Sequence, residues 1–401
     1  MSVVSPMLWL ECQQEQVEVS TAAQVAGLVA VLRRVPDWRD PRGVRYELAP
    51  VLALWVAGNI AGHDTTVAVW EWACALPVGV LAGLGFPRRV PSERTIRRIV
   101  EEGPPGQLDQ ALSGWTAAVA PGPADPGGLV AVAFDGKVMK GARSRPPQGS
   151  VRQEAVVEAV RHDTGTALGH QRVVAGDEIA SVRRLVNRVC DHNTLVTTDC
   201  LHAHEPLARA IRAKGGHWLF SIKGNQPTVR AKLAGLPWDE FGNQHVTREK
   251  AHGRIEERAL KALTPSAPSL VGFRGTRQVV KLARTTRRKK TTTSPAATST
   301  EEFYLVTSLS TDQASPAQLA RWARGHWTVE AIHHVRDRTM DEDRHTIRTK
   351  NAALNWAIAR DTTISALRLA GYKNIRQARR ATIRDPGLVL QIIALTSQNR
   401  L

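Results

Sequence analysis

Beyond residue 128, short apolar, β-prone runs alternate with helix-like segments, and this alternation constrains the fold more than any other feature of the sequence. Leu129–Phe134 and Asn193–Thr198 are two such runs, whereas Asp177–Val189 and Glu205–Lys214 are helix-like. Strands that alternate with helices favour an α/β domain built on a mixed sheet. Further strand candidates are Ala155–Val160, Ala167–Val174, Trp218–Ile222 and Phe303–Leu309.

The chain divides into a helical beginning, an α/β middle and a short end. Residues 1–120 carry apolar residues at helical spacing, and the Pro/Gly-rich segment Pro121–Gly128 then marks a boundary. We expect the α/β domain over residues 129–370, with a β insertion at about residues 245–300. Residues 371–401 are expected to form a C-terminal tail.

The protein is strongly basic, with a formal net charge of +17 over 401 residues and a pI near 10.4. Such a charge attracts polyanions, of which DNA is the first candidate and a membrane surface the second. No apolar run approaches the roughly 18–20 residues that a membrane span needs, and Met1–Val17 lacks the basic start of a signal peptide. We therefore expect a cytoplasmic, nucleoid-associated protein without a membrane partner.

Four cysteines are scattered along the chain, so a disulfide framework is not expected. One local cluster carries side chains that can bind zinc: Cys190, His192, Cys200, His202 and His204. Its spacing does not match a usual zinc pattern, which makes a zinc site the weaker interpretation of this segment.

Asp135 and Asp199 each follow a predicted strand directly, so both are expected at the sheet edge where α/β proteins place their ligands. Glu330, from a later helix, is the third carboxylate of the candidate site. Three hard oxygen donors from separate elements suit Mg²⁺, and two ions about 3.5–4 Å apart can clamp the attacking and leaving oxygens of a phosphodiester. The alternative is that the aspartates only end strands and that Glu330 is a solvated helix residue.

The helix that carries Glu330 is expected to begin at Ser315-Pro316 and to run to about Arg338, with serine as N-cap and proline at the first helical position. A second long helix should follow from about Asn351 to Leu369. The face around Glu330 would carry His326, Trp327, His333, His334 and Asp337. Such an acid–imidazole stripe could meet metal, water and phosphate, or could be a buried polar stripe packed on the sheet. Glu342 and Asp343 are rival third ligands, but they lie beyond the expected end of the helix.

A candidate DNA-binding helix begins after Ser92, a natural N-cap. Arg94, Arg97 and Arg98 would project from its first turns, which resembles the start of a DNA-recognition helix. A surface helix with solvated arginines is an equal alternative. The basic run Arg284–Lys290 leaves a similar choice between a clamp for DNA phosphates and a solvated loop.

Several short blocks resemble, in order, those of bacterial insertion-sequence transposases of the ISAs type, also called H-repeat-associated proteins. The blocks are Val35–Arg42, Trp70–Trp72, Pro91–Arg98, Phe134–Lys137 with Lys140–Arg143, Thr198–His204, Lys223–Gln226, His252–Glu256, and Arg324–Glu330 with Asp341–Asp343 and Ile347–Thr349. One block alone would be weak, whereas several in the family's order make a strong match over about residues 30–370.

Some positions depart from the family's usual motifs. The usual Lys-Ser-Asn-Glu-Ile stands here as Ala175–Ile179, and Cys200 and His204 replace alanine and glutamine. Ala331 follows Glu330 where the family often has asparagine. None of these changes removes a metal ligand, but they leave room for an inactivated or domesticated copy.

The resemblance implies a DDE transposase with an RNase H-like catalytic core. Asp135, Asp199 and Glu330 would hold two Mg²⁺ ions, for which Mn²⁺ could substitute. The reaction would be cleavage at the ends of a mobile element, followed by attack of the freed 3′-OH on target DNA, without a covalent enzyme intermediate. The partners would be the terminal inverted repeats and target DNA, bound by a homo-oligomer.

Side chains around these carboxylates are expected to bind DNA rather than to cut it. Lys137, Lys140 and Arg143 could neutralise phosphates, and Lys223 with Asn225 could touch the backbone near the site. Trp327 could stack on a base, although a core tryptophan is more common. The full set of predicted DNA contacts is Arg94, Arg97, Arg98, Lys137, Lys140, Arg143, Lys223, Asn225, Arg324, His326 and Trp327.

Two rival functions stay open at this stage. The first is a DNA-binding protein derived from a transposase without catalytic activity, against which the intact carboxylates count. The second is a different RNase H-like nuclease that cuts nucleic acid without joining it, which a strand-transfer assay on end-containing DNA would distinguish.

Overall fold

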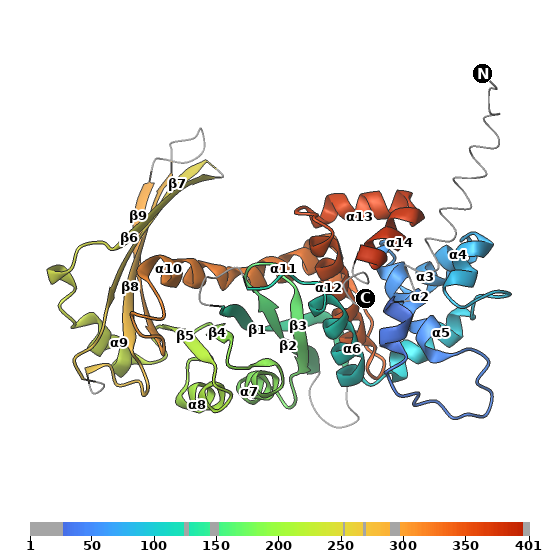
Figure 1. The fold of residues 1–401 in the computed structure, drawn as a ribbon, viewed down its shortest axis with the longest axis horizontal. Helices are drawn as coiled ribbons and strands as arrows, with labels where there is room; N and C mark the ends of the chain where they lie inside the picture. The colour runs from blue at the N-terminus through green and yellow to red at the C-terminus, as the bar shows by residue number, and fades with distance from the viewer. Residues whose placement is uncertain are drawn as a thin grey trace, which may run out of the picture.

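A computed structural model describes residues 27–123, 128–144, 152–251, 253–267, 270–288 and 297–395. These residues form a mixed α/β fold in which one long sheet lies beside a helical region (Figure 1). Part of the expected boundary segment Pro121–Gly128 falls outside the described residues. Of the helices described, none combines the length and the hydropathy that crossing a membrane requires.

The sheet has nine strands in the order β3-β2-β1-β4-β5-β9-β8-β7-β6. Strand β1 is antiparallel to β2 and parallel to β4, and β4 is parallel to β5. From β5 onward the neighbours β9, β8, β7 and β6 are all antiparallel. The bounds are β1 Val130–Ser144, β2 Arg152–Arg161, β3 Ala167–Arg172, β4 Thr194–Thr198, β5 His217–Ile222, β6 His245–Ala251, β7 Arg254–Leu263, β8 Gln278–Arg288 and β9 Ala297–Thr307.

Helices precede, interrupt and follow the sheet, and residues 27–32 are also helical. The bounds are α2 Leu48–Ile60, α3 Thr66–Cys74, α4 Val78–Gly83, α5 Glu93–Glu102, α6 Pro105–Ala117, α7 Glu178–Val189, α8 Glu205–Ala213, α9 Pro227–Ala234, α10 Pro316–Gly325, α11 Trp327–Thr339, α12 Ala352–Leu369, α13 Ile375–Arg384 and α14 Pro386–Leu395. The segment expected to be a C-terminal tail therefore contains two helices, α13 and α14.

Alternating side chains of β1 bury both faces of the sheet. Val132 and Phe134 pack into a core that includes Val182 of α7 and Ile211 of α8. Ala133 points the other way, into a core shared with Val329 and Ile332 of α11. Helices α7 and α8 thus cover one face and α11 the other, which positions α11 across the central strands (Figure 1).

The helical region is built around two helices that are buried along almost their whole length, α2 and α12. Trp55 of α2 and Trp356 of α12 meet edge to face with their ring centroids 5.5 Å apart. Since α12 follows the sheet in sequence and α2 precedes it, the first and last parts of the chain share one core.

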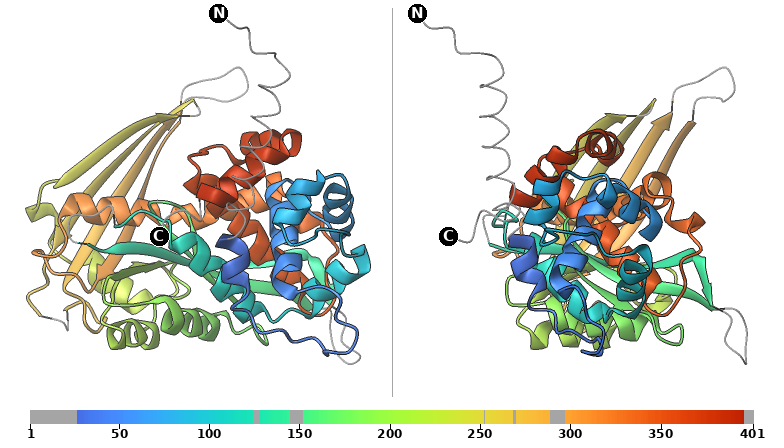
Figure 2. Two further views of the ribbon diagram at one scale, coloured as in Figure 1. Left: turned by 45° about the vertical axis from the view of Figure 1, so that its right-hand side comes forward. Right: turned by 90° about the vertical axis from the view of Figure 1, so that its right-hand side faces the viewer.

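Strands β6–β9 extend the sheet well beyond the central strands and project from the body (Figure 2). Arg284–Arg288 belongs to strand β8 rather than to a loop, because it pairs with both β7 and β9. Lys289 and Lys290 lie outside the described residues. Residues 297–300, expected as a polar loop, are the start of β9 for the same reason.

Two element boundaries also differ from the predictions. Asp135 does not end its strand: β1 continues to Ser144 because its pairing with β2 extends past the last β1–β4 pair, Phe134 with Thr198. The helix that begins at Ser315 is divided into α10 and α11 at His326. Gly325 stands at this division, where a Cβ would fall 2.2 Å from the His162 ring, so a side chain could not be accommodated without a shift.

Candidate functional site

Asp135 and Asp199 lie next to each other on neighbouring strands. The parallel register of β1 and β4 ends with Phe134 opposite Thr198, and the two aspartates are the next residue of each chain segment. Neighbouring strands are about 4.8 Å apart, so their side chains meet at the same edge. The Asp135 carboxylate accepts a hydrogen bond from the backbone N–H of Gly136 at 2.8 Å, and that of Asp199 accepts one from Leu201 at 3.0 Å.

Glu330 reaches this edge from α11, in its first turn. Its pKa is raised by partial burial and then by the nearby Asp135 charge, with Asp199 adding to the effect. The pKa of Asp135 is raised for the same reasons, first by burial and then by the charges of Asp199 and Glu178. Carboxylates from three distant segments therefore repel one another in one place, which a bound cation would relieve.

Two imidazoles, those of His326 and His333, lie near the carboxylates. His333 places Nδ1 3.7 Å from Asp135 Oδ2 and Nε2 3.1 Å from Glu158 Oε2, and burial lowers its pKa. His326 places Nδ1 3.2 Å from the Thr197 hydroxyl, and burial lowers its pKa to about 4. His326 is therefore neutral at pH 7, so it cannot offer the positive charge expected of a phosphate contact. His334 lies on the exposed side of α11.

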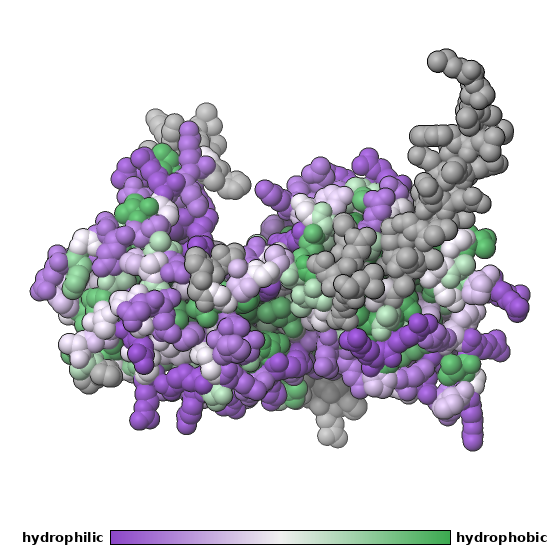
Figure 3. All heavy atoms as spheres, in the orientation of Figure 1, coloured by the Kyte–Doolittle hydropathy of each residue, from purple (hydrophilic) through white to green (hydrophobic). Residues whose placement is uncertain are grey.

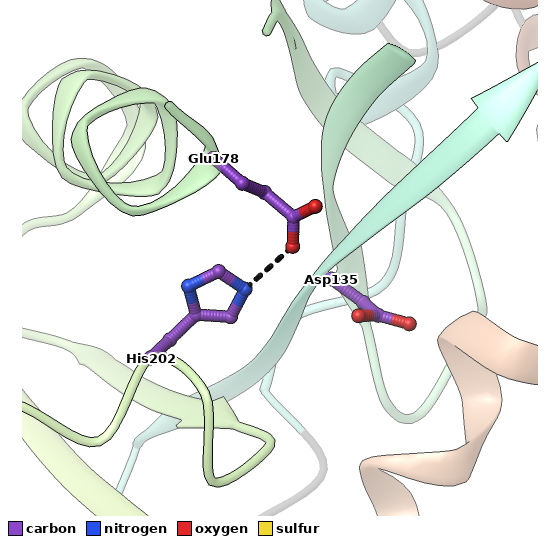
Figure 4. A group of neighbouring side chains, drawn as sticks. All are labelled: Asp135, Glu178 and His202. Carbon is purple, nitrogen blue, oxygen red and sulfur yellow. Dashed lines mark hydrogen bonds and ion pairs between the residues drawn. The ribbon is translucent and has the colours of Figure 1, made fainter. Parts of the chain in front are cut away.

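Glu178 and His202, which the sequence interpretation did not include in the site, lie beside Asp135. His202 Nε2 is 2.9 Å from Glu178 Oε1, and the ligand atoms of Asp135, Glu178 and His202 all lie within 4.8 Å of one another (Figure 4). Glu178 stands in Ala175–Ile179, which departs from the family's usual motif but keeps its glutamate, and His202 stands in Thr198–His204, a block that carries the resemblance. The glutamate retained in the first block was the signal that could have pointed to it.

The rival ligands are engaged elsewhere. Glu342 is buried in the short 3₁₀ turn after α11, between Arg336 at 2.7 Å and Arg360 at 3.0 Å. The Asp343 carboxylate pairs with Lys140 at 2.8 Å. The zinc interpretation gains no support, since the candidate metal clusters among the described residues contain no cysteine.

Lys137 is not placed as its predicted role in DNA binding requires. Its side chain is buried and its ammonium lies 2.7 Å from Asp337, with Glu342 and Asp343 at 3.8 and 3.9 Å. Because β1 continues past Asp135, Lys137 points into this acidic pocket instead of toward solvent. The other predicted contacts, apart from His326, are exposed: Arg94, Arg97, Arg98, Lys140, Arg143, Lys223, Asn225, Arg324 and Trp327.

Basic and aromatic side chains line the space between the projecting strands and α10–α11. A cavity of about 250 Å³ contains Asp199, Glu330, Lys223, Arg284 and Trp327 in its lining, and a second of about 840 Å³ also reaches Glu330. Trp327 is 54% exposed, so it is not a core tryptophan. The Arg284 guanidinium lies 6.0 Å from its ring centroid. On the molecular surface, a hollow with hydrophilic residues on both sides separates the projecting strands from α13 (Figure 3).

The fold is that of an α/β protein, and the acidic residues Asp199 and Glu330 share a cavity lining with basic side chains. The chain belongs to the transposase DDE domain family, whose model matches residues 130–367, more than half of the chain. Residues 29–116 match the model of the domain associated with that family. The resemblance to DDE transposases is thereby confirmed.

Two relatives of the chain also carry the names of putative transposases. The chain is 26% identical over 337 residues to "Putative transposase YncI" of Escherichia coli O157:H7, covering 82% of this chain and 84% of that protein. It is 24% identical over 346 residues to "H repeat-associated putative transposase YhhI" of E. coli K12, covering 83% and 88%. A piggyBac transposase in a synaptic complex with hairpin DNA aligns with a TM-score of 0.38 and 10% identity over 96% of this chain and 78% of that one, a likeness too low to identify the fold.

Proposed function

We propose that the protein is a DNA transposase that cuts DNA at the ends of its insertion sequence and joins the freed 3′-OH to target DNA. The proposal is supported by the adjacency of Asp135 and Asp199, which follow the last β1–β4 pair, and by the electrostatic influence of both on Glu330 of α11. Family membership supports the same reaction class. The DNA substrates would be the terminal inverted repeats and the target duplex.

An RNase H-like core is part of this proposal. The order β3-β2-β1-β4-β5, with the first three strands antiparallel and β1, β4 and β5 parallel, supports it. Helices α7 and α8 on one face and α11 on the other complete the arrangement. The helical region before residue 120 would be a DNA-binding region, and strands β6–β9 an insertion between β5 and the helix that bears Glu330.

The donor set fits divalent magnesium. Asp135, Asp199 and Glu330 offer carboxylate oxygens, which Mg²⁺ and Mn²⁺ prefer, and their mutual repulsion is the charge that two such ions would balance. Bound there, the ions supply Lewis-acid stabilisation of the attacking and leaving oxygens of a phosphodiester.

The side chains around the carboxylates would bind and orient the DNA. Lys223 contributes a positive charge to the cavity lining near Glu330, and it would contact a phosphate near the scissile bond. Asn225 holds the turn after Asp199, since its amide donates to the Cys200 carbonyl at 2.6 Å. Trp327 at the cleft would stack on a base. A protein of charge +17 would associate with the nucleoid, and would act there as a homo-oligomer that brings two element ends together.

The proposal is tested with the full-length chain and a duplex that carries an element end. Cleavage in Mg²⁺, loss of cleavage in EDTA and strand transfer into a second duplex are expected. Asp135→Asn should abolish both steps while DNA affinity is kept or slightly increased, because a carboxylate facing phosphate loses its charge. Normal cleavage by this variant would contradict the proposed site. Cleavage without joining would favour a nuclease, and DNA binding without cleavage would favour an inactive derivative.

A further inference from the structure

Glu178 reaches the carboxylate edge from the side opposite to Glu330. It is the first residue of α7, and the cap of this helix is Asp177, whose side chain accepts from the Ala180 N–H at 2.8 Å. This cap fixes the first turn over β1, so that the Glu178 carboxylate extends toward Asp135 (Figure 4). Its side chain is 28% exposed, so it is open to solvent and to a solvated ion.

Gly136 makes this approach possible. A Cβ built on Gly136 would lie 2.3 Å from the Glu178 carboxyl carbon and 2.5–2.6 Å from its two oxygens, distances at which atoms overlap. Glu178 thus occupies the volume that any other residue after Asp135 would fill. The missing side chain lets two carboxylates come together on one strand edge.

The buried His202 side chain contacts the Glu178 carboxylate. Its side chain is 1% exposed, and its Nε2 lies 2.9 Å from Glu178 Oε1 and 4.0 Å from Asp199 Oδ1. Its other ring nitrogen, Nδ1, has no hydrogen-bond partner. The proton therefore belongs on Nε2, which donates to Glu178. The His202 imidazole therefore orients the Glu178 carboxylate, as hydrogen-bonding groups behind metal ligands commonly do.

The charges around Glu178 are not balanced by the protein. In the described part of the chain, Asp135 and Glu178 form ion pairs with the imidazoles His333 and His202, and with no lysine or arginine. By contrast, Glu342 and Asp361 each contact an arginine. Two carboxylates that share an edge without a fixed cation are suited to a mobile one, and hard oxygen donors select Mg²⁺ or Mn²⁺.

We propose that Glu178 is a fourth carboxylate of the metal site, which binds the ion held by Asp135, and that His202 is the positioning residue that orients it. This inference rests on the proposed function, because it takes Asp135 as a metal ligand. Glu178 would add a carboxylate from α7 to those that Asp199 and Glu330 would contribute.

The experiment measures Mn²⁺ and Mg²⁺ binding to the full-length protein by titration calorimetry, without DNA. Glu178→Gln keeps the shape of the side chain and removes its charge, and it should raise the Kd for Mn²⁺ about 10- to 100-fold. Gly136→Ala should give a comparable loss by displacing the Glu178 carboxylate. Asp177→Asn is the matched control: it removes the same charge from the neighbouring residue and still caps α7, so its Kd should stay within twofold of wild type.

Thermal unfolding separates a ligand from a structural residue. In EDTA, Glu178→Gln should unfold at the wild-type temperature or above it, because it relieves repulsion with Asp135, and the increase on adding Mn²⁺ should be smaller than in wild type. A lower unfolding temperature in EDTA with unchanged Mn²⁺ affinity would overturn the proposal and make Glu178 a structural partner of His202. Unchanged affinity in Glu178→Gln, with loss in Asp135→Asn, would overturn it while the proposed function stands. Unchanged affinity in both variants would overturn the metal site itself.

Discussion

His170 of β3 and Asp361 of α12 are 191 residues apart, yet Nε2 of the one lies 2.8 Å from Oδ2 of the other. The second ring nitrogen of His170 lies 2.6 Å from Asp109 of α6. The Asp361 carboxylate also accepts from Arg336 at 2.9 Å, and Arg336 belongs to α11, the helix that carries Glu330. A buried charge network therefore joins the sheet, the helical region and the helix of the candidate site.

The first prediction concerns the pH dependence of stability. Two carboxylates raise the pKa of His170 to about 10, against the effect of burial, so the imidazolium is charged in the folded protein. A raised folded pKa stabilises the fold fully below the unfolded value of about 6.5 and loses that contribution as pH rises toward 10. The free energy of unfolding in urea should therefore fall between pH 7 and pH 10.

His170→Gln should flatten this pH dependence and lower stability at pH 6 by about 1–3 kcal/mol, because Asp109 and Asp361 each lose one charged partner and keep Arg188 and Arg336, respectively. Unfolding curves at pH 6, 8 and 9.5 measure both effects. If the variant keeps the wild-type slope between pH 7 and 10, the charge of His170 is not its source.

The second prediction distinguishes the two candidates for the third ligand. Glu330→Gln should fold normally and lose cleavage in Mg²⁺. Glu342→Gln should lower stability by about 3–5 kcal/mol, because it removes the negative charge that pairs with the buried guanidinium groups of Arg336 and Arg360. Cleavage assays below the unfolding temperature of each variant make the comparison. Loss of metal affinity in the well-folded Glu342→Gln protein, with normal affinity in Glu330→Gln, would reverse the assignment.

The third prediction concerns a stability cost within the site. The folded pKa of Asp135 is raised, first by burial, so its ionisation opposes folding and stability is lost as pH rises through that value. In EDTA at pH 7, Asp135→Asn should raise the unfolding temperature by ~1–3 °C, and Mn²⁺ should no longer raise it further. A decrease in EDTA would mean that Asp135 is a structural residue.

Locally encoded features were predictable from sequence. Ser92 and Ser315 both cap helices with the expected bonds, at 3.3 Å to Thr95 N–H and 3.3 Å to Gln318 N–H. Asp199 ends its strand as predicted, because Thr194–Thr198 is a short run buried on both faces. Caps and apolar runs depend on neighbours within a few residues, which the sequence displays directly.

Features that depend on distant partners were not predictable. The length of β1 depends on pairing with β2, and the burial of Lys137 depends on Asp337, 200 residues away. The closeness of Glu178 to Asp135 depends on the missing side chain of Gly136. Each of these follows from the tertiary arrangement, and none leaves a periodic signal in the sequence.

The last prediction concerns where the positive charge acts on DNA. Helix α5 exposes Arg94, Arg97 and Arg98 while burying Ile96 and Ile99, so its arginines face solvent. If α5 reads base edges, Arg94→Ala should reduce the preference for element ends over scrambled DNA by about 1–3 kcal/mol. Arg287 and Arg288, exposed at the end of β8, should contact phosphates instead, so replacing both with alanine should weaken both duplexes equally and reduce the salt slope by about one per lost contact.

Binding isotherms at several salt concentrations, on end and scrambled duplexes, measure both effects. Arg209→Ala is the control, because it removes one exposed charge from α8 on the opposite face of the sheet from α10–α11. It should change neither affinity nor salt slope. Equal losses on both duplexes for Arg94→Ala would make α5 a phosphate-binding or solvated helix. Unchanged affinity of the Arg287 and Arg288 double variant would show that the end of β8 does not contact DNA. If Arg209→Ala loses as much affinity as one of the other variants, net charge alone governs binding, rather than any particular surface.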